Sequence, residues 1–211
     1  MRNIRELLDI APVLPVVTID DAAVAVDVAQ ALAEGGIGVA EITLRTPAGL
    51  PAIERIAERL PEFVVAAGTV LTSADLASAE RAGAAFAVSP GATRELLAAA
   101  RGRDIAYLPA IATASELMHA ADYGYDCFKF FPAAAAGGIA ALESFAGPFP
   151  DARFCPTGGI TADTAAEYLA CANVLCVGGS WIASHGAIAK RDWAAITRAA
   201  RHAAALRPKC R

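Results

Sequence analysis

Short, uninterrupted apolar runs recur along this chain, with their centres a little over twenty residues apart. Most of the intervals between them carry an alanine-rich stretch with helical periodicity, such as residues 22–33 and 51–60. Fully apolar strands that alternate with helices are typical of a parallel sheet that is covered on both faces. The eight expected strands are residues 13–19, 39–44, 64–67, 86–88, 106–108, 127–131, 153–155 and 174–177.

Eight strand–helix units within 211 residues favour a closed (β/α)8 TIM barrel with an all-parallel sheet over an open, doubly wound α/β sheet. No linker, low-complexity run or shift of composition divides the chain, so we expect residues 1–211 to form a single domain. With 56% hydrophobic and 19% charged residues the chain can bury a large core, which excludes a disordered protein.

Local chemistry marks the ends of the expected helices. Thr72, Thr113 and Thr161 each precede an acidic residue by two or three positions, as N-terminal caps do. Several helical stretches are followed by a glycine just before the next strand, which predicts left-handed C-terminal caps. The glycines concerned are Gly35, Gly36, Gly83, Gly102 and Gly124.

Charge and composition exclude several classes of partner. The net charge of -4 leaves no cationic surplus for a phosphate backbone, so we expect no nucleic-acid partner. Residues 168–189 lack Asp, Glu, Lys and Arg, but Asn173 and the pair Gly178-Gly179 interrupt them, which favours a buried strand and loop over a membrane span. The first residues are interrupted by Arg5 and Glu6 and so lack the apolar stretch of a secretory signal.

The cysteines and histidines show no metal-binding pattern. No pair of cysteines has C-x-x-C spacing, and the three histidines lack the paired spacing of metal ligands, so we assign no metal and no cofactor. An odd number of cysteines also argues against a disulfide framework and favours buried thiols in a cytoplasmic protein. These residues are Cys127, Cys155, Cys171, Cys176 and Cys210, with His119, His185 and His202.

Lys129 is the one lysine inside an expected strand, since Lys190 and Lys209 belong to the C-terminal helix and tail. A charged amine is costly to bury, so Lys129 should have a charged partner or surroundings that favour the neutral amine. Such surroundings are also what Schiff-base formation requires, because the neutral amine is the nucleophile. A buried salt bridge with a purely structural role is the alternative.

Glu41 is the one acidic residue inside an expected strand, and it shares a side-chain face with Thr43 and Arg45. Inside a barrel this face would meet Lys129, from the sixth expected strand, across the interior. An amine, a carboxylate and a guanidinium would then surround one space. A structural Glu41–Lys129 pair would explain two of these groups but would leave Arg45 without a role.

Two glycine pairs, each with a neighbouring hydroxyl, follow the last two expected strands. They are Thr157-Gly158-Gly159 and Gly178-Gly179-Ser180. Glycines let backbone N–H groups approach an anion, and the ends of the seventh and eighth strands of barrels commonly hold phosphate. We therefore expect a phosphate site here, with a pair of simple tight turns as the alternative.

These residues fall within segments that resemble the bacterial 2-keto-3-deoxy-6-phosphogluconate (KDPG) aldolases, which also act on 4-hydroxy-2-oxoglutarate (KHG). The resemblance runs nearly from end to end of the chain. Its segments are PVLPV (12–16), EITLRT (41–46), AGTVL (67–71), SPG (89–91), FKFFPA (128–133), GPF (147–149), RFCPTGGI (153–160) and CVGGSW (176–181).

The resemblance implies a class I, metal-independent aldolase on a (β/α)8 barrel that takes a small-molecule substrate and forms a homotrimer. It implies that Lys129 is the Schiff-base lysine and that Glu41 moves protons, largely through a water molecule. Arg45 and Thr69 match the residues that hold the pyruvyl carboxylate. The other substrate-binding positions are Pro90, Phe131 and Thr157, the last near the substrate hydroxyls, and the phosphate-binding positions are Gly158, Gly159, Gly179 and Ser180.

The chain departs from the family pattern at three positions. Ala134 replaces the glutamate of the usual PAE, Ala110 the second residue of PG, and Ala66 the first residue of GAGT. None removes a catalytic group, but loop packing and the pocket mouth could change, and with them rate and substrate preference. Thr157 favours the gluconate substrate over its galactonate epimer, whose aldolases tend to carry valine there. The alternatives are a 2-keto-3-deoxy-6-phosphogalactonate aldolase, a phosphosugar isomerase or epimerase with Glu41 as base, and a non-catalytic barrel that binds a phosphorylated metabolite.

Overall fold

The structure is a computed structural model, which describes residues 3–206. It is an α/β fold in which short buried strands alternate with helices along the chain. The strands are β1 Val13–Val17, β2 Val39–Thr43, β3 Val64–Gly68, β4 Phe86–Val88, β5 Ala106–Leu108, β6 Ala110–Ile111, β7 Cys127–Phe130, β8 Arg153–Pro156 and β9 Val177–Gly179. The helices are α1 Ile4–Leu8, α2 Ala25–Glu34 after a short 3-10 turn at Ala22–Val24, α3 Gly49–Arg59, α4 Ser73–Arg81, α5 Arg94–Arg101, α6 Ala114–Asp122, α7 Gly138–Ala146, α8 Ala165–Leu169, α9 His185–Ala189 and α10 Trp193–Ala204.

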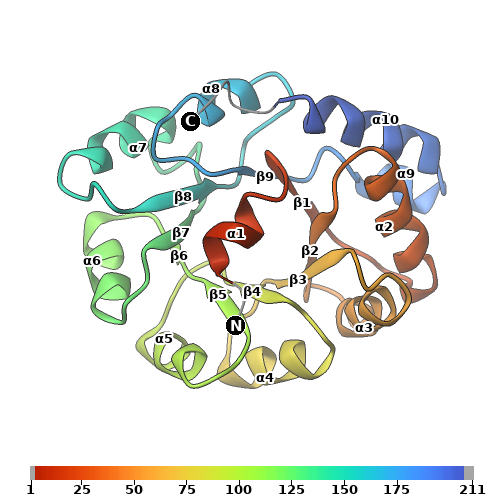
Figure 1. Cartoon of the computed structure of the whole chain (residues 1–211), viewed down its shortest axis with the longest axis horizontal. Helices are drawn as coiled ribbons and strands as arrows, with labels where there is room; N and C mark the ends of the chain where they lie inside the picture. The colour runs from red at the N-terminus through yellow and green to blue at the C-terminus, as the bar shows by residue number, and fades with distance from the viewer. Residues whose placement is uncertain (1–2, 207–211) are drawn as a thin grey trace.

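All strand pairs in the described residues are parallel, which confirms the predicted α/β class with a parallel sheet. One sheet has the order β5-β4-β3-β2-β1-β9 and the other has the order β6-β7-β8. Figure 1 shows the strands curling around α1, with the other helices outside them. In the described residues the strands form two separate hydrogen-bonded sheets rather than one continuous closed sheet. The predicted closed barrel is therefore not confirmed.

Two places interrupt the ladder. Pro109, which has no N–H to donate, separates β5 from β6. Strand β5 matches the fifth expected strand, whereas β6 was not predicted. Between β8 and β9 the contact consists of isolated bridges, Phe154 with Val174 and Thr157 with Gly178. The last expected strand therefore begins at Val177, three residues later than predicted.

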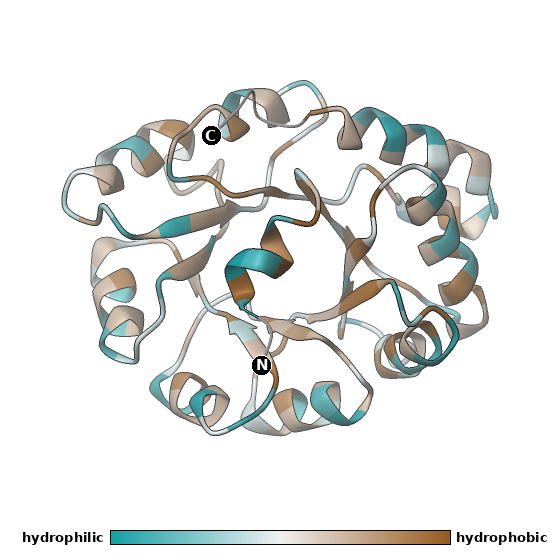
Figure 2. Cartoon of the chain, viewed as in Figure 1, coloured by the Kyte–Doolittle hydropathy of each residue, from teal (hydrophilic) through white to brown (hydrophobic). Residues whose placement is uncertain are grey.

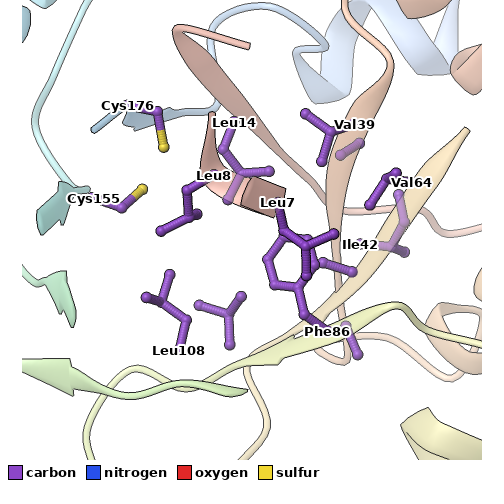
Figure 3. Packing of buried hydrophobic residues seen from close by; sticks show 14 of the residues in the cluster. Leu7, Leu8, Leu14, Val39, Ile42, Val64, Phe86, Leu108, Cys155 and Cys176 are labelled. Carbon is purple, nitrogen blue, oxygen red and sulfur yellow. The ribbon is translucent and has the colours of Figure 1, made fainter. Parts of the chain in front are cut away.

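The N-terminal helix α1 lies at the end of the strands where they begin. Its Arg5 guanidinium bonds to the Asp126 carboxylate at 2.8 Å and to the Asp151 carbonyl at 3.0 Å, two residues that lie just before β7 and β8. Figure 3 shows Leu7 and Leu8 of α1 among the inward-pointing side chains of the strands. Because α1 occupies this end, the opposite ends of the strands are left for a site.

Apolar burial explains how the helices sit on the strands. The side chains of β1, β2 and β3 are buried along their whole length, as expected for strands covered on both faces. Figure 2 shows hydrophobic residues on the strands and on the helix sides that face them, with hydrophilic residues outside. In the described part of the chain, no helix is both long enough and apolar enough to cross a bilayer.

The predicted helix ends are confirmed in part. Thr72 and Thr113 each form a capping box with the acidic residue three positions later, whereas the Thr161 prediction is wrong. Helix α8 begins at Ala165, and the Thr161 N–H instead donates to the Thr164 hydroxyl at 3.0 Å. Among the glycines, Gly36, Gly83 and Gly124 have positive φ as predicted, but Gly35 and Gly102 have φ of -81° and -89°.

Gly35 is explained by close packing instead. A Cβ atom at this position would lie 2.4 Å from the Ala200 Cβ of α10, so the glycine lets α2 and α10 approach each other.

The prediction that the cysteines are buried needs one correction. Cys127, Cys155 and Cys176 are buried, but Cys171 is only half-buried, and Cys210 lies outside the described residues.

We expect the free energy of unfolding to fall as the pH rises above about 9. Burial raises the pKa of the Cys127 thiol to about 12 and that of the Tyr125 phenol to about 12. The unfolded chain therefore loses these protons first, and each such group lowers stability by about 1.4 kcal/mol per pH unit between its two pKa values. Urea unfolding at about pH 8 and about pH 10.5 measures the fall. Tyr125→Phe should make it shallower, and an unchanged pH dependence in this variant would contradict the assignment.

Candidate active site

Lys129 and Glu41 meet in the interior, as predicted from the sequence. The Lys129 Nζ lies 3.1 Å and 3.2 Å from the two carboxylate oxygens of Glu41. Their side chains are 5% and 1% exposed. Away from water, each group stabilises the charge of the other, and removal of either partner would leave a buried charge unpaired. Lys129 also lies 5.5 Å from the ring centroid of Phe131, so an aromatic face covers one side of the amine.

The neighbouring strand leaves room for the Glu41 carboxylate. Glu41 in β2 pairs with Ala66 in β3, and Gly68 lies two residues further along on the same face. A Cβ atom at Gly68 would lie 2.2 Å from the Glu41 Oε1 and 2.5 Å from its Cγ. No role was predicted for Gly68 from the sequence, although a glycine that ends an otherwise apolar strand often marks a close approach of another group to the backbone.

Arg45 and Thr69, the predicted carboxylate-binding pair, lie together where β2 and β3 end. The Arg45 Nε donates a hydrogen bond to the Thr69 Oγ1 at 3.2 Å. Arg45 is exposed and Thr69 is half-buried, so a ligand can reach both. Arg45 lies in the turn that follows β2, two residues after Thr43, so the strand face that it was predicted to share with Glu41 does not extend to it.

Pro90 follows β4 and is half-buried at the same end of the strands. The residue before it, Ser89, is fully buried, and its hydroxyl lies 2.6 Å from the phenol oxygen of Tyr107 in β5. The Val70 N–H donates to the Val88 carbonyl at 3.1 Å, which joins the segment before Pro90 to the turn that carries Thr69. Pro90 was expected from the family resemblance, but the Ser89–Tyr107 contact was not predicted, because Tyr107 fits an ordinary apolar strand.

Thr157 and the two glycine pairs also lie side by side. Thr157 is bridged to Gly178, and a Cβ atom at Gly178 would lie 2.1 Å from the Thr157 hydroxyl. Gly158 and Gly159 have φ of 100° and 75°, a backbone conformation that side-chain-bearing residues rarely adopt. The two glycine segments therefore lie next to each other.

The ends of β9 and β7 complete this region. At Gly179 a Cβ atom would lie 1.9 Å from the Trp181 ring, and Ser180 next to it is exposed.

Two of the three departures from the family pattern flank the same site. Ala110 is buried and pairs with Lys129, while Ala134 is exposed and its N–H donates to the Gly158 carbonyl at 3.0 Å.

The remaining polar candidates lie outside this cluster. His185 and Asp20 form an exposed contact with 2.6 Å between Nε2 and Oδ2. Within residues 3–206, no group of three or more His, Cys, Asp or Glu side chains is arranged to hold a metal ion.

A buried amine beside a carboxylate can add to a ketone and pass protons to and from the adduct. The profile of the family described as KDPG and KHG aldolase matches residues 4–199. This chain belongs to that family. Within it, the 2-dehydro-3-deoxy-phosphogluconate aldolase of Pseudomonas aeruginosa is 50% identical over 193 residues, which cover 92% of this chain and 88% of the relative.

Two solved structures of KDPG aldolases resemble the fold closely. The enzyme from Legionella pneumophila, with pyruvate captured at low pH as a covalent carbinolamine intermediate, has a TM-score of 0.95 and 44% identity, covering 96% of this chain and 98% of the other. The enzyme from Zymomonas mobilis with 3-phosphoglycerate has a TM-score of 0.93 and 47% identity, covering 98% and 97%. A covalent pyruvate adduct and a phosphorylated ligand thus both occur on this fold.

Proposed function

We propose that this protein is a class I aldolase that cleaves KDPG to pyruvate and glyceraldehyde 3-phosphate, with Lys129 as the Schiff-base nucleophile. The observation that carries the proposal is the buried Lys129 amine within hydrogen-bond distance of both oxygens of Glu41. A carboxylate in this position can take a proton from the amine before attack and can then serve the later proton transfers.

The reaction follows from these two groups. The Lys129 amine attacks the C2 ketone, and the ketone oxygen leaves as water to give an iminium ion. Glu41 accepts the proton of the C4 hydroxyl, directly or through a water, as the C3–C4 bond breaks and its electrons pass to the iminium nitrogen. Glyceraldehyde 3-phosphate leaves, the resulting enamine is protonated at C3, and hydrolysis releases pyruvate and restores the amine.

The surrounding residues take the substrate-binding roles. Arg45, Thr69 and Pro90 hold the pyruvyl carboxylate at the ends of β2, β3 and β4, where a guanidinium and a hydroxyl already lie together. Phe131 covers one side of the amine. Thr157 contacts the substrate hydroxyls, and the phosphate binds the backbones of Gly158, Gly159, Gly179 and Ser180.

The proposed substrates differ in how much of this site they use. The gluconate substrate carries a phosphate for the glycine-rich segments, whereas KHG has none and would use only the part around Lys129. The family includes aldolases for both, and Thr157 supports the gluconate compound over its galactonate epimer as the main substrate. Ala110 and Ala134 depart from the family pattern, so they are the positions at which the cleavage rate of this protein could differ from that of its relatives.

The assembly is proposed on the same basis. We infer one domain in which β5 and β6 together act as one of eight strands of a closed (β/α)8 barrel, because the Pro109 carbonyl between them accepts a hydrogen bond from the Lys129 N–H at 2.9 Å. We also infer a homotrimer, which light scattering would test.

Free thiols in the described residues fit a cytoplasmic location.

Borohydride trapping tests the mechanism directly. We expect incubation with pyruvate followed by reduction to attach a pyruvate-derived group to Lys129, which peptide mapping by mass spectrometry would locate. Lys190 is an exposed lysine within the same chain and serves as the internal control, because it should stay unmodified. Bound pyruvate with an unmodified Lys129 would contradict the aldolase mechanism and favour a proton-transfer enzyme or a binding protein.

A further inference from the structure

Tyr107 and Ser89 form a buried polar contact beside the proposed site. Tyr107 is 4% exposed and Ser89 is fully buried, and their hydroxyl oxygens are 2.6 Å apart. Because side chains alternate along a strand, Tyr107 faces the helices while its neighbour Leu108 points into the interior (Figure 3). The Tyr125 ring packs edge-on against Tyr107, with 5.6 Å between ring centroids.

Ser89 links the contact with Tyr107 to the proposed site, because it directly precedes Pro90 in the chain. Its N–H points to the Leu108 carbonyl at 3.4 Å, and its side chain is held by Tyr107, so both its backbone and its hydroxyl are tied to β5. Pro90, the proposed carboxylate-binding residue, follows directly in the chain. The Val88 carbonyl, on the other side of Ser89, accepts the hydrogen bond of the Val70 N–H.

The turn that carries Thr69 connects this segment to Arg45. Thr69 has a φ of 60°, which is costly for a residue with a branched side chain and persists only where neighbours fix it. One of these fixed points is the Val70–Val88 hydrogen bond beside it. In this conformation the Thr69 hydroxyl accepts the hydrogen bond from Arg45. Hydrogen bonds and adjacent backbone residues therefore connect Tyr107 on β5 to Arg45 after β2.

We propose that the Tyr107 hydroxyl is a positioning group for the pyruvate carboxylate site, acting through Ser89 on Pro90, Thr69 and Arg45. This inference rests on the function proposed above. A phenylalanine would fill the same space against Tyr125 but would leave the Ser89 hydroxyl without its buried partner. Burial also raises the pKa of Tyr107 well above its ordinary value, so the phenol stays protonated over the working pH range.

The test measures pyruvate binding separately from folding. In Tyr107→Phe we expect the pyruvate concentration that half-saturates borohydride trapping at Lys129 to rise about three- to tenfold, with the maximal labelled fraction unchanged. Tyr125→Phe is the matched control, because its hydroxyl donates to the Leu97 carbonyl at 3.1 Å, away from the site. That variant should lose stability and keep the wild-type half-saturating concentration within about twofold.

A double variant separates positioning from stability. Ser89→Ala with Tyr107→Phe removes both hydroxyls, so it should regain stability relative to Tyr107→Phe alone, while pyruvate binding stays weak. Wild-type half-saturation in Tyr107→Phe, or recovery of binding together with stability in the double variant, would overturn the proposal. If the unaltered protein forms no adduct at Lys129, the proposed function fails instead, so the two failures are distinguishable.

Discussion

Replacing Lys129 with methionine is expected to lower the kcat/KM for KDPG cleavage by at least about 10⁴-fold. Methionine fills similar space beside Phe131 but has no amine, so neither the carbinolamine nor the iminium can form. Release of pyruvate, followed with a coupled assay over a range of substrate concentrations, measures the loss. Cleavage at a rate near that of the unaltered protein would rule out Lys129 as the nucleophile.

Stability is the control for this substitution. Glu41, which is 1% exposed, would be left as an unpaired buried carboxylate, and we expect a cost of about 3–5 kcal/mol in the free energy of unfolding. The double variant with Glu41→Gln removes both charges and should regain much of this stability without regaining activity. If Lys129→Met retained proton exchange on a ligand but not cleavage, an isomerase with Glu41 as base would be favoured.

Gly68→Ala is expected to lower kcat/KM by about 100-fold or more, although Gly68 itself carries no functional group. The added Cβ would lie 2.2 Å from the Glu41 Oε1, so the carboxylate must leave its present position beside Lys129. Because both side chains are buried, we also expect a loss of about 1–3 kcal/mol in stability from overpacking. Enzyme kinetics and urea unfolding of the same preparation measure the two effects.

Gly147→Ala is the matched control for this steric argument. No atom lies within 4 Å of a Cβ built at Gly147, and its φ of -67° suits alanine. Activity and stability should therefore stay close to those of the unaltered protein. If Gly68→Ala kept full activity as well, the Glu41 carboxylate would not need its observed position.

The central pair of the site could be predicted from the sequence because a charge inside an apolar strand is rare. Lys129 and Glu41 stand out for this reason. The expected alternation also placed Arg45 on the face of Glu41, but β2 ends at Thr43 and Arg45 lies in the turn that follows. The first seven expected strands agree with the structure to within two residues at each end, since each apolar run is long enough to identify. The break at Pro109 and the late start of β9 were missed, because apolar runs show burial but not which backbone groups are paired.

Gly68 and Tyr107 illustrate what could not be predicted. A glycine after an apolar run fits many turns, and the contact with Glu41 depends on the β2–β3 register. Tyr107 fits a buried strand, and its partner Ser89 is set by the pairing of β4 with β5. Both roles depend on neighbours from another strand, which the local pattern around a residue does not contain.

The sequence by itself determined that Lys129 and Glu41 lie inside buried strands and need a charged partner, because strand burial and the cost of a buried charge act locally. The tertiary structure alone decided that Lys129 and Glu41, 88 positions apart, lie 3.1 Å from each other. That distance depends on the curvature and register of the sheet, and both arise from the packing of all the strands and helices together.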